Sequence, residues 1–194
     1  MFRLGLTGSI GMGKSTTAQM FADRGCAVWD ADARVHAMYA VGGAAVSPIG
    51  DMFPQAILNG AVDRGALRDI ISADAGALER IEQIVHPLVR ADRDGFAPDT
   101  EIAVFDIPLL FETVTQAQMD ATACVWVDAA EQRRRVLARG TMDAAQFEAI
   151  LAKQMPIEQK RALADYEIET DTLDHVASQV DAVLADVTRR MHDA

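Results

Sequence analysis

The sequence has few cysteines and no long apolar run, and each of these absences excludes a class of protein. Two cysteines occur among 194 residues, Cys26 and Cys124, and both lie in apolar stretches. Without further cysteines or a matching Cys/His spacing, they predict buried thiols rather than a disulfide framework or a zinc site. No stretch approaches the roughly 18 consecutive apolar residues of a membrane span. The first residues carry a single Arg3 before a glycine-interrupted run, which is not a signal-peptide pattern. We therefore expect a reduced, cytoplasmic protein.

Basic residues are also scarce. Eighteen Lys and Arg stand against 29 Asp and Glu, and the formal net charge is −11. A chain this acidic is a poor general binder of nucleic acid or of anionic membranes, because both are negatively charged. It can still take a small anionic substrate where a few basic side chains gather. Hydrophobic residues make up 50% of the chain, which suits one domain with a sizeable core.

Short apolar runs alternate with helical patterns through most of the chain. Strands are expected at 2–7, 26–29, 102–106, 123–127 and 166–168. Helices are expected at 14–24, 33–39, 64–72, 77–94, 130–139, 143–153, 157–164 and 173–191. This alternation predicts an α/β fold around a parallel sheet that is buried on both faces. The middle region, roughly 34–98, contains a Gly- and Pro-rich stretch and no strand pattern, so we expect a helical insertion there.

A glycine-rich segment follows the first expected strand. It has the pattern G-x-x-x-x-G-K-[ST], and a helix is expected immediately after it. Glycines let the main chain curl so that its N–H groups point at phosphate oxygens, and the positive end of the helix strengthens their field. Lys14 is expected to reach the β- and γ-phosphates, and the Ser15 hydroxyl to bind Mg²⁺. The residues expected to hold a nucleoside triphosphate are Gly8, Gly11, Met12, Gly13, Lys14, Ser15 and Thr16.

A phosphate loop of this kind occurs both in nucleotide-dependent switches and in kinases. Guanine-specific switches usually carry an N-K-x-D segment and a D-x-x-G after their metal-side aspartate. This chain has no N-K-x-D, and the third expected strand ends in Asp106-Ile107-Pro108-Leu109, without that glycine. We therefore expect a phosphotransferase that uses ATP and Mg²⁺, and the alternative is a nucleotide sensor without catalytic activity.

Two carboxylates are candidates for the chemistry. Phosphoryl transfer needs neutralised charge, an aligned acceptor and a group that takes the acceptor's proton. Asp32 follows the second expected strand, so it should lie at the carboxyl edge of the sheet as the base. The alternative role for Asp32 and for nearby Asp30 is to cap the next helix. Asp106 ends the third strand, where it would hold Mg²⁺. Alternatively, its carboxylate is only hydrogen-bonded to neighbouring residues at the strand end.

Four arginines follow the fourth expected strand, at positions 133, 134, 135 and 139. Arg135 and Arg139 are four residues apart, so they share one face of the expected helix. A basic lid that closes over ATP would bring such charges to the transferred phosphate. Arg139 is the candidate for that role, whereas Arg133 and Arg134 are expected to be solvated.

Six segments follow one another in a recognisable order: LTGSIGMGKST at 6–16, D-A-D at 30–32, H-P-x-x-R at 86–90, DIPLLFE at 106–112, QRRRVLARG at 132–140 and ILAKQM at 150–155. The phosphate loop alone marks only a superfamily, but the later motifs in this order are far more specific. Together these segments resemble the dephospho-coenzyme A kinase family over nearly the whole chain. Other small-molecule phosphate-loop kinases, which act on nucleotides, shikimate or gluconate, are the alternative.

The resemblance implies a three-layer α/β/α phosphate-loop NTPase fold with a parallel sheet, a helical acceptor-binding insertion and a lid. It implies transfer of the γ-phosphoryl group of ATP to the ribose 3′-hydroxyl of dephospho-coenzyme A. Asp32 matches the family's proposed base, Lys14 its ATP site and Arg139 its lid arginine. His86 and Arg90 match a segment near the acceptor, where Arg90 would bind anionic oxygens. His86 is alternatively a helix cap or a hydrogen-bonded core residue.

The implied layout is one kinase domain over residues 1–194. Its core comprises 1–33, 99–137 and 165–194, its insertion about 34–98 and its lid about 138–150. The expected partners are the small molecules ATP and dephospho-coenzyme A, and neither nucleic acid nor a membrane. The chain departs from the family pattern after the last strand, where Ile-Glu-Thr-Asp stands in place of a stretch that often contains asparagine. We assign no adenine contact to that stretch.

Overall fold

The computed structural model describes residues 1–193. Its contacts divide the chain into two compact units, Met1–Trp29 with Pro98–Ala194, and Asp30–Ala97. The first, which we call the sheet unit, holds a hydrophobic core between strands and helices. The second, the helical unit, has a hydrophobic core of its own. The finer division into core, insertion and lid stays a prediction.

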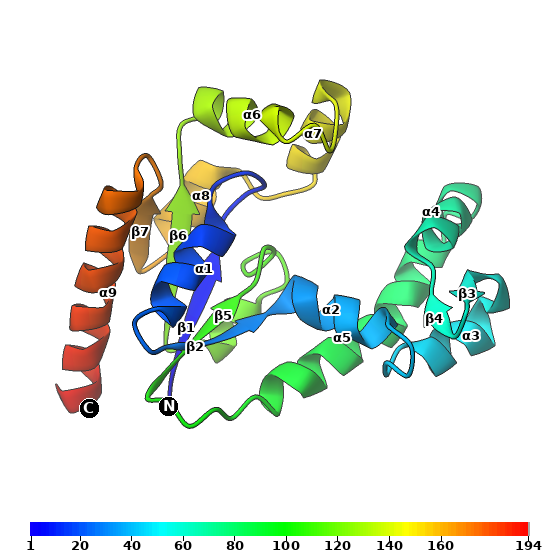
Figure 1. The fold of residues 1–194 in the computed structure, drawn as a ribbon, viewed down its shortest axis with the longest axis horizontal. Coiled ribbons are helices and arrows are strands. Elements are labelled where there is room, and N and C mark those ends of the chain that lie inside the picture. The colour runs from blue at the N-terminus through cyan, green and yellow to red at the C-terminus, as the bar shows by residue number, and fades with distance from the viewer. Residues whose placement is uncertain (194) are drawn as a thin grey trace. The chain divides into compact units, whose positions relative to one another are not determined.

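Five strands form the main sheet in the order β2-β5-β1-β6-β7 (Figure 1). They are β1 (Phe2–Thr7), β2 (Ala27–Asp30), β5 (Ile102–Asp106), β6 (Ala121–Trp126) and β7 (Tyr166–Glu169). The central strand β1 pairs in parallel with β5 and β6, so that Leu4 lies between Val104 and Ala121. Parallel strands end at the same edge of a sheet, so the loops that follow β1, β5 and β6 meet there. This edge carries the candidate site.

Helices flank both faces of this sheet. Those of the sheet unit are α1 (Lys14–Ala22), α6 (Ala129–Ala138), α7 (Ala144–Leu151), α8 (Ile157–Leu163) and α9 (Leu173–Asp193), with the short 3-10 helix η2 at Thr115–Gln118. Helices α1 and α9 pack against each other over one face (Figure 1). Helix α8 packs against β6, and its Arg161 lies over the Trp126 ring. The predicted three-layer α/β/α architecture with a parallel sheet is confirmed.

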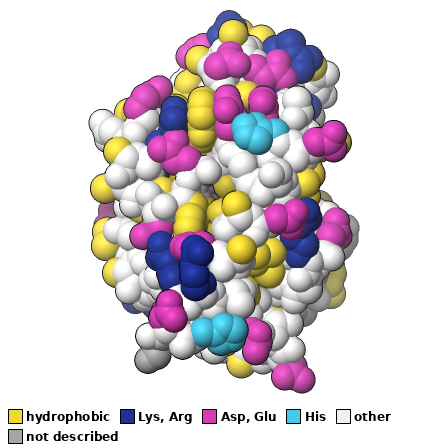
Figure 2. All heavy atoms as spheres, turned by 90° about the vertical axis from the view of Figure 1, so that its left-hand side faces the viewer, with side chains coloured by type: hydrophobic (Ala, Val, Ile, Leu, Met, Phe, Trp, Pro, Cys, Tyr) yellow, Lys and Arg dark blue, Asp and Glu magenta, His cyan; other side chains and the backbone are white. Residues whose placement is uncertain are grey.

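The surface of α9 mixes charges of both signs. Figure 2 shows this side of the molecule, where acidic and basic side chains alternate and hydrophobic ones form small groups. Arg189 and Arg190 of α9 both pair with Asp186, and Arg24 pairs with Asp181. Over the described atoms of this side, no continuous basic surface of the kind that binds nucleic acid is formed. In residues 1–193, no helix has both the length and the apolar character that crossing a bilayer requires.

The helical unit contains a hairpin and a helix that the sequence analysis did not predict. Its elements are α2 (Ala31–Tyr39), α3 (Val46–Met52), η1 (Pro54–Ala56), β3 (Ile57–Leu58), β4 (Ala61–Val62), α4 (Arg64–Ala73) and α5 (Ala77–Asp94). The expectation of a region without strands was wrong because Asn59-Gly60 is a turn pair: both have positive φ, 51° and 79°, as a two-residue hairpin requires. Helix α3 forms despite Pro48, which lies in its first turn, where no N–H is needed.

We expect Gly60→Ala to lower the free energy of unfolding by about 1–2 kcal/mol, because a side chain at this positive φ strains the backbone. A steric clash does not contribute to this loss, because the added Cβ would contact only the Val41 side chain, at 3.8 Å. Urea denaturation followed by circular dichroism measures the change. Gly76→Ala, at φ −89°, is the control, because it adds the same methyl group without positive-φ strain; it replaces the N-cap glycine of α5, so a smaller loss, of up to about 1 kcal/mol, is expected. Equal losses in the two variants would contradict the turn assignment.

Candidate phosphate-binding site

The glycine-rich segment curls between the end of β1 and the start of α1, where its sequence predicts it. Gly11 and Gly13 have φ values of 80° and 82°, and Gly13 is the residue that begins α1 as its N-cap. A Cβ on Gly11 would come within 2.3 Å of the Val136 side chain, so helix α6 packs directly on this segment. The curl therefore depends both on glycine backbone freedom and on close contact with α6.

Lys14, the first residue of α1, forms an ion pair with Asp106 at the end of β5. Strands β1 and β5 are neighbours with Leu6 opposite Asp106, and this register brings Asp106 beside the segment. The Asp106 side chain is 2% exposed and that of Lys14 14%. The structure thus joins two predicted site residues, an ammonium and a buried carboxylate, at the sheet edge. Because the Asp106 carboxylate already has Lys14 as an ion-pair partner, its role as a metal ligand stays a prediction.

The other predicted loop residues differ in what they offer a ligand. The side chains of Ser15 and Thr16 are exposed at the start of α1. Met12, in contrast, buries its side chain in the core, where it is 1% exposed, and its N–H donates to the Ser9 carbonyl at 3.2 Å. Met12 therefore shapes the loop from beneath, whereas Ser15 and Thr16 face outward.

A cavity of about 270 Å³ opens beside the loop. Gly11, Gly13 and Thr16 line it on one side, and Arg135 and Arg139 of α6 line it on another. The chain after β7 contributes the remaining wall, from Thr170 to Leu173 together with Val176. Glycine backbone, a helix N-terminus and two guanidinium groups around one cavity are the features that favour a polyanion.

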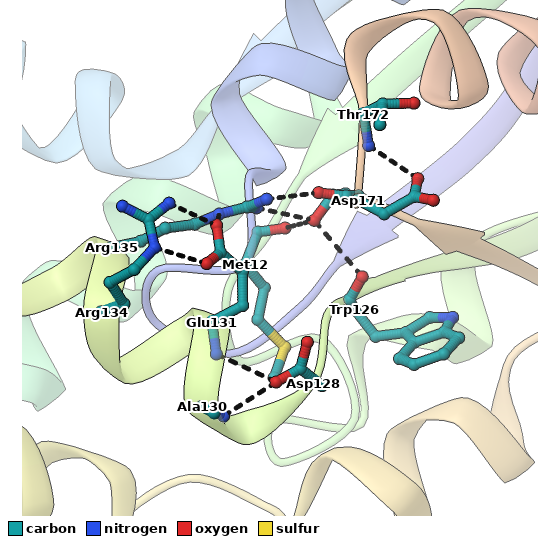
Figure 3. A network of polar contacts seen from close by, with 10 residues as sticks. Met12, Trp126, Asp128, Ala130, Glu131, Arg134, Arg135, Asp171 and Thr172 are labelled. Carbon is teal, nitrogen blue, oxygen red and sulfur yellow. Dashed lines mark hydrogen bonds and ion pairs between the residues drawn. The ribbon is translucent and has the colours of Figure 1, made fainter.

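Arg135 fastens the chain after β7 to α6 (Figure 3). Its guanidinium donates to the Thr170 carbonyl at 2.6 Å, to the Thr170 hydroxyl at 3.1 Å and to Glu131 at 2.7 Å. The Thr170 hydroxyl in turn donates to the Met12 carbonyl at 3.0 Å. Hydrogen bonds from Arg134 and Arg135 lower the pKa of Glu131 to about 2, so it stays ionised. Thr170 therefore joins three segments of the cavity wall.

Arg139 ends α6 as its C-cap residue, is exposed and lines the cavity. It is thus close to the loop, as the proposed lid arginine should be. Arg133 and Arg134 are exposed and paired with Glu148 and Glu131 respectively, as expected for solvated arginines. Thr170 was missed by the sequence analysis, because a threonine after a strand has no distinguishing pattern in a single sequence.

Asp32 lies in the helical unit, in the first turn of α2, with an exposed side chain. The N-cap of this helix is Asp30, whose carboxylate accepts from the Ala33 N–H at 3.0 Å. The capping role is therefore correct for Asp30 and wrong for Asp32. Within residues 1–193 the Asp32 carboxylate has no hydrogen-bond or ion-pair partner, and its role as the base stays a prediction.

His86 and Arg90 lie one turn apart on α5, which continues through Pro87. Both side chains are exposed, and neither has a polar partner among the residues that the structure describes. The alternative that His86 is a cap or a core residue is wrong, because it stands in the middle of the helix and faces solvent. The two residues instead present a basic pair on one helix face.

The family model for dephospho-CoA kinase matches residues 2–175. The chain belongs to the dephospho-CoA kinase family. A relative named dephospho-CoA kinase, from Ruegeria pomeroyi, is 60% identical over 96% of this chain and 95% of its own length. A crystal structure from Thermus thermophilus has 31% identity and a TM-score of 0.83, and covers 95% of this chain and 97% of its own. A dephospho-CoA kinase from Campylobacter jejuni shares the fold with a TM-score of 0.67 at 21% identity, over 96% and 97% of the two chains.

Membership of this family confirms the resemblance that the motifs predicted. It also decides between the two classes that contain such loops, because the family is one of kinases rather than of nucleotide sensors. The glycine loop, Lys14 and the cavity beside α6 are therefore parts of a phosphotransferase that uses ATP.

Proposed function

We propose that the chain transfers the γ-phosphoryl group of ATP to the ribose 3′-hydroxyl of dephospho-coenzyme A and so forms coenzyme A, the final step of its synthesis, in the cytoplasm. The observation that carries this proposal is the 60% identity with a dephospho-CoA kinase over 96% of the chain. The intact loop beside the Lys14–Asp106 pair supports it chemically.

ATP would place its triphosphate along the loop. Backbone N–H groups of the curl, the N-terminus of α1 and the Lys14 ammonium would then face its oxygens, and Arg139 would approach from α6. Lys14 would exchange Asp106 for phosphate in this step. The Asp106 carboxylate and the Ser15 hydroxyl are oxygen ligands of the kind that Mg²⁺ prefers, and they are the residues that would hold the ion. Bound Mg²⁺ would neutralise part of the negative charge of the phosphates.

The acceptor would be handled by residues of the helical unit. Asp32 would accept the proton of the 3′-hydroxyl as its oxygen attacks the γ-phosphorus, and its lack of a competing partner suits that role. His86 and Arg90 would bind anionic oxygens of the acceptor's pyrophosphate from one face of α5. Each group would thus have a single role, which is to hold the donor, to hold the acceptor or to move the proton.

The decisive assay offers candidate acceptors separately to the protein with ATP and Mg²⁺ and measures ADP release. We expect rapid release with dephospho-coenzyme A, and only background release with shikimate, gluconate, a nucleoside monophosphate or no acceptor. Rapid release with one of the other acceptors, or release that does not depend on an acceptor, would contradict the proposed function.

We expect Arg139→Met to lower kcat by on the order of a hundredfold, because the transferred phosphoryl group loses a positive charge in the transition state. The equilibrium affinity for ATP should fall much less. Arg134→Met is the matched control on the same helix, since its side chain is 67% exposed, and it should retain kcat within about twofold. Steady-state kinetics compare the two variants. If Arg139→Met has the same kcat as Arg134→Met, then Arg139 has no role in catalysis.

A further inference from the structure

Ile10, near the middle of the phosphate loop, has both of its peptide groups held by glutamine side chains. Its carbonyl accepts from the Gln132 Nε2 at 2.7 Å, and its N–H donates to the Gln154 Oε1 at 3.1 Å. A carbonyl can only accept and an N–H can only donate, so these partners fix which way each amide points. One residue of the loop is thus clamped from two sides by opposite hydrogen-bonding groups.

The two glutamines flank the segment that we expect to act as the lid. Gln132 lies on α6, which enters this segment, and Gln154 lies just after α7, which leaves it. The Gln132 side chain is 3% exposed and Gln154 is half-buried, so both hydrogen bonds are partly sheltered from water. Both ends of the segment are therefore tied to the same loop residue, although neither glutamine is next to the loop in the sequence.

An ion pair between buried Lys160 and half-buried Glu112 lies next to the second of these ties. The residue after Gln154, Met155, donates its N–H to Glu112 Oε1 at 2.8 Å, and the Lys160 ammonium lies 2.9 Å from the same oxygen. Lys160 is fully buried and also donates to the Pro108 carbonyl at 2.8 Å. Burial raises the pKa of Glu112, but the hydrogen bonds from Lys160 and Met155 outweigh it, so the pKa is lowered and the carboxyl is ionised.

We propose that Gln132 and Gln154 are positioning residues that hold the phosphate loop in the conformation that binds the triphosphate, and that the Glu112–Lys160 pair fixes Gln154 for this purpose. The proposal rests on the proposed function and adds residues to the same site. Ile10 lies between Gly8 and Gly11, whose freedom permits several peptide orientations. Clamping the Ile10 peptide removes those alternatives before ATP arrives, so less ordering opposes binding.

The test compares two replacements of equal length at Gln154. Gln154→Met removes the acceptor oxygen, whereas Gln154→Glu keeps an oxygen that can accept from Ile10. We expect Gln154→Met to weaken ATP binding about tenfold, measured by calorimetric titration without acceptor, and to lower kcat to a similar extent. The KM for dephospho-coenzyme A should change less than twofold. Gln154→Glu adds a negative charge that salt screens only in part at this half-buried position, so its loss of ATP affinity relative to the wild type should shrink as salt is raised, whereas that of Gln154→Met should not.

Gln159→Met is the matched control, because Gln159 is exposed on α8 and should leave ATP binding unchanged. Gln132→Met tests the other hydrogen bond independently and is expected to weaken ATP binding at least as much. Thermal melts of all variants report folding. Unchanged ATP affinity in folded Gln154→Met, or in Gln132→Met if the former is unfolded, would overturn the proposal. Failure of the wild type to phosphorylate dephospho-coenzyme A would instead overturn the proposed function, because the ATP titration does not depend on the acceptor.

Discussion

Replacement of Lys14 by methionine is expected to lower kcat/KM for ATP by about a thousandfold or more. The ammonium belongs to a residue of the loop motif itself, and it would stabilise the negative charge of the γ-phosphoryl group in the transition state. Methionine keeps an apolar stem and removes the charge, so the loss reports on the charge rather than on packing. Steady-state kinetics with ATP as the varied substrate measure it.

In Lys14→Met, an effect on stability has to be distinguished from an effect on catalysis. Lys14→Met also removes an ion-pair partner of buried Asp106, and we expect it to cost about 2 kcal/mol of unfolding free energy. The double variant Lys14→Met/Asp106→Asn should recover much of that stability, since the buried charge is gone, and remain inactive. Wild-type kinetics in Lys14→Met would mean that the phosphates lie elsewhere.

Replacement of Asp32 by asparagine is expected to slow kcat by a hundredfold or more while ATP affinity stays unchanged. Asparagine preserves the shape of the side chain but cannot accept the proton of the acceptor hydroxyl, and general bases typically contribute factors of about 10²–10⁴. The Asp32 carboxylate has no partner within the described chain, so the substitution breaks no contact there and folding should be unaffected.

Asp30→Asn provides the control for this prediction two residues earlier in the chain. Asp30 caps α2, and asparagine caps helices about as well as aspartate, so both stability and turnover should be retained. A comparable loss of turnover in both variants would indicate a general effect of charge near the start of α2. Full activity of Asp32→Asn would exclude the general-base role.

Strands and helices with a clear apolar periodicity could be predicted from the sequence. The strands Phe2–Thr7 and Ile102–Asp106 and the helix Ala77–Asp94 have the bounds expected from their apolar periodicity. The hairpin at Ile57–Val62 was missed, although Asn59-Gly60 is a strong turn signal, because each strand is only two residues long and offers no alternation to recognise.

The candidate site was predictable only where its residues carry a motif. The loop and Arg139 were named from sequence patterns, and the structure places them at one cavity. Thr170 carries no motif. Gln132 and Gln154 lie within the segments 132–140 and 150–155, but their hydrogen bonds to Ile10 join residues far apart in the sequence, and such contacts leave no periodic or spacing signal in a single chain. Likewise, only the observed helix bounds assign the capping role to Asp30 and the exposed position to His86.

The central claim is most directly tested by locating the phosphoryl group in the product. The protein is incubated with Mg²⁺, dephospho-coenzyme A and ATP labelled at the γ-phosphate, and the product is analysed by mass spectrometry and phosphorus NMR. The account predicts one labelled phosphoryl group per molecule, esterified to the ribose 3′-oxygen, and one ADP per product. A labelled product phosphorylated at another position, or ATP consumed without any labelled ester, would contradict it.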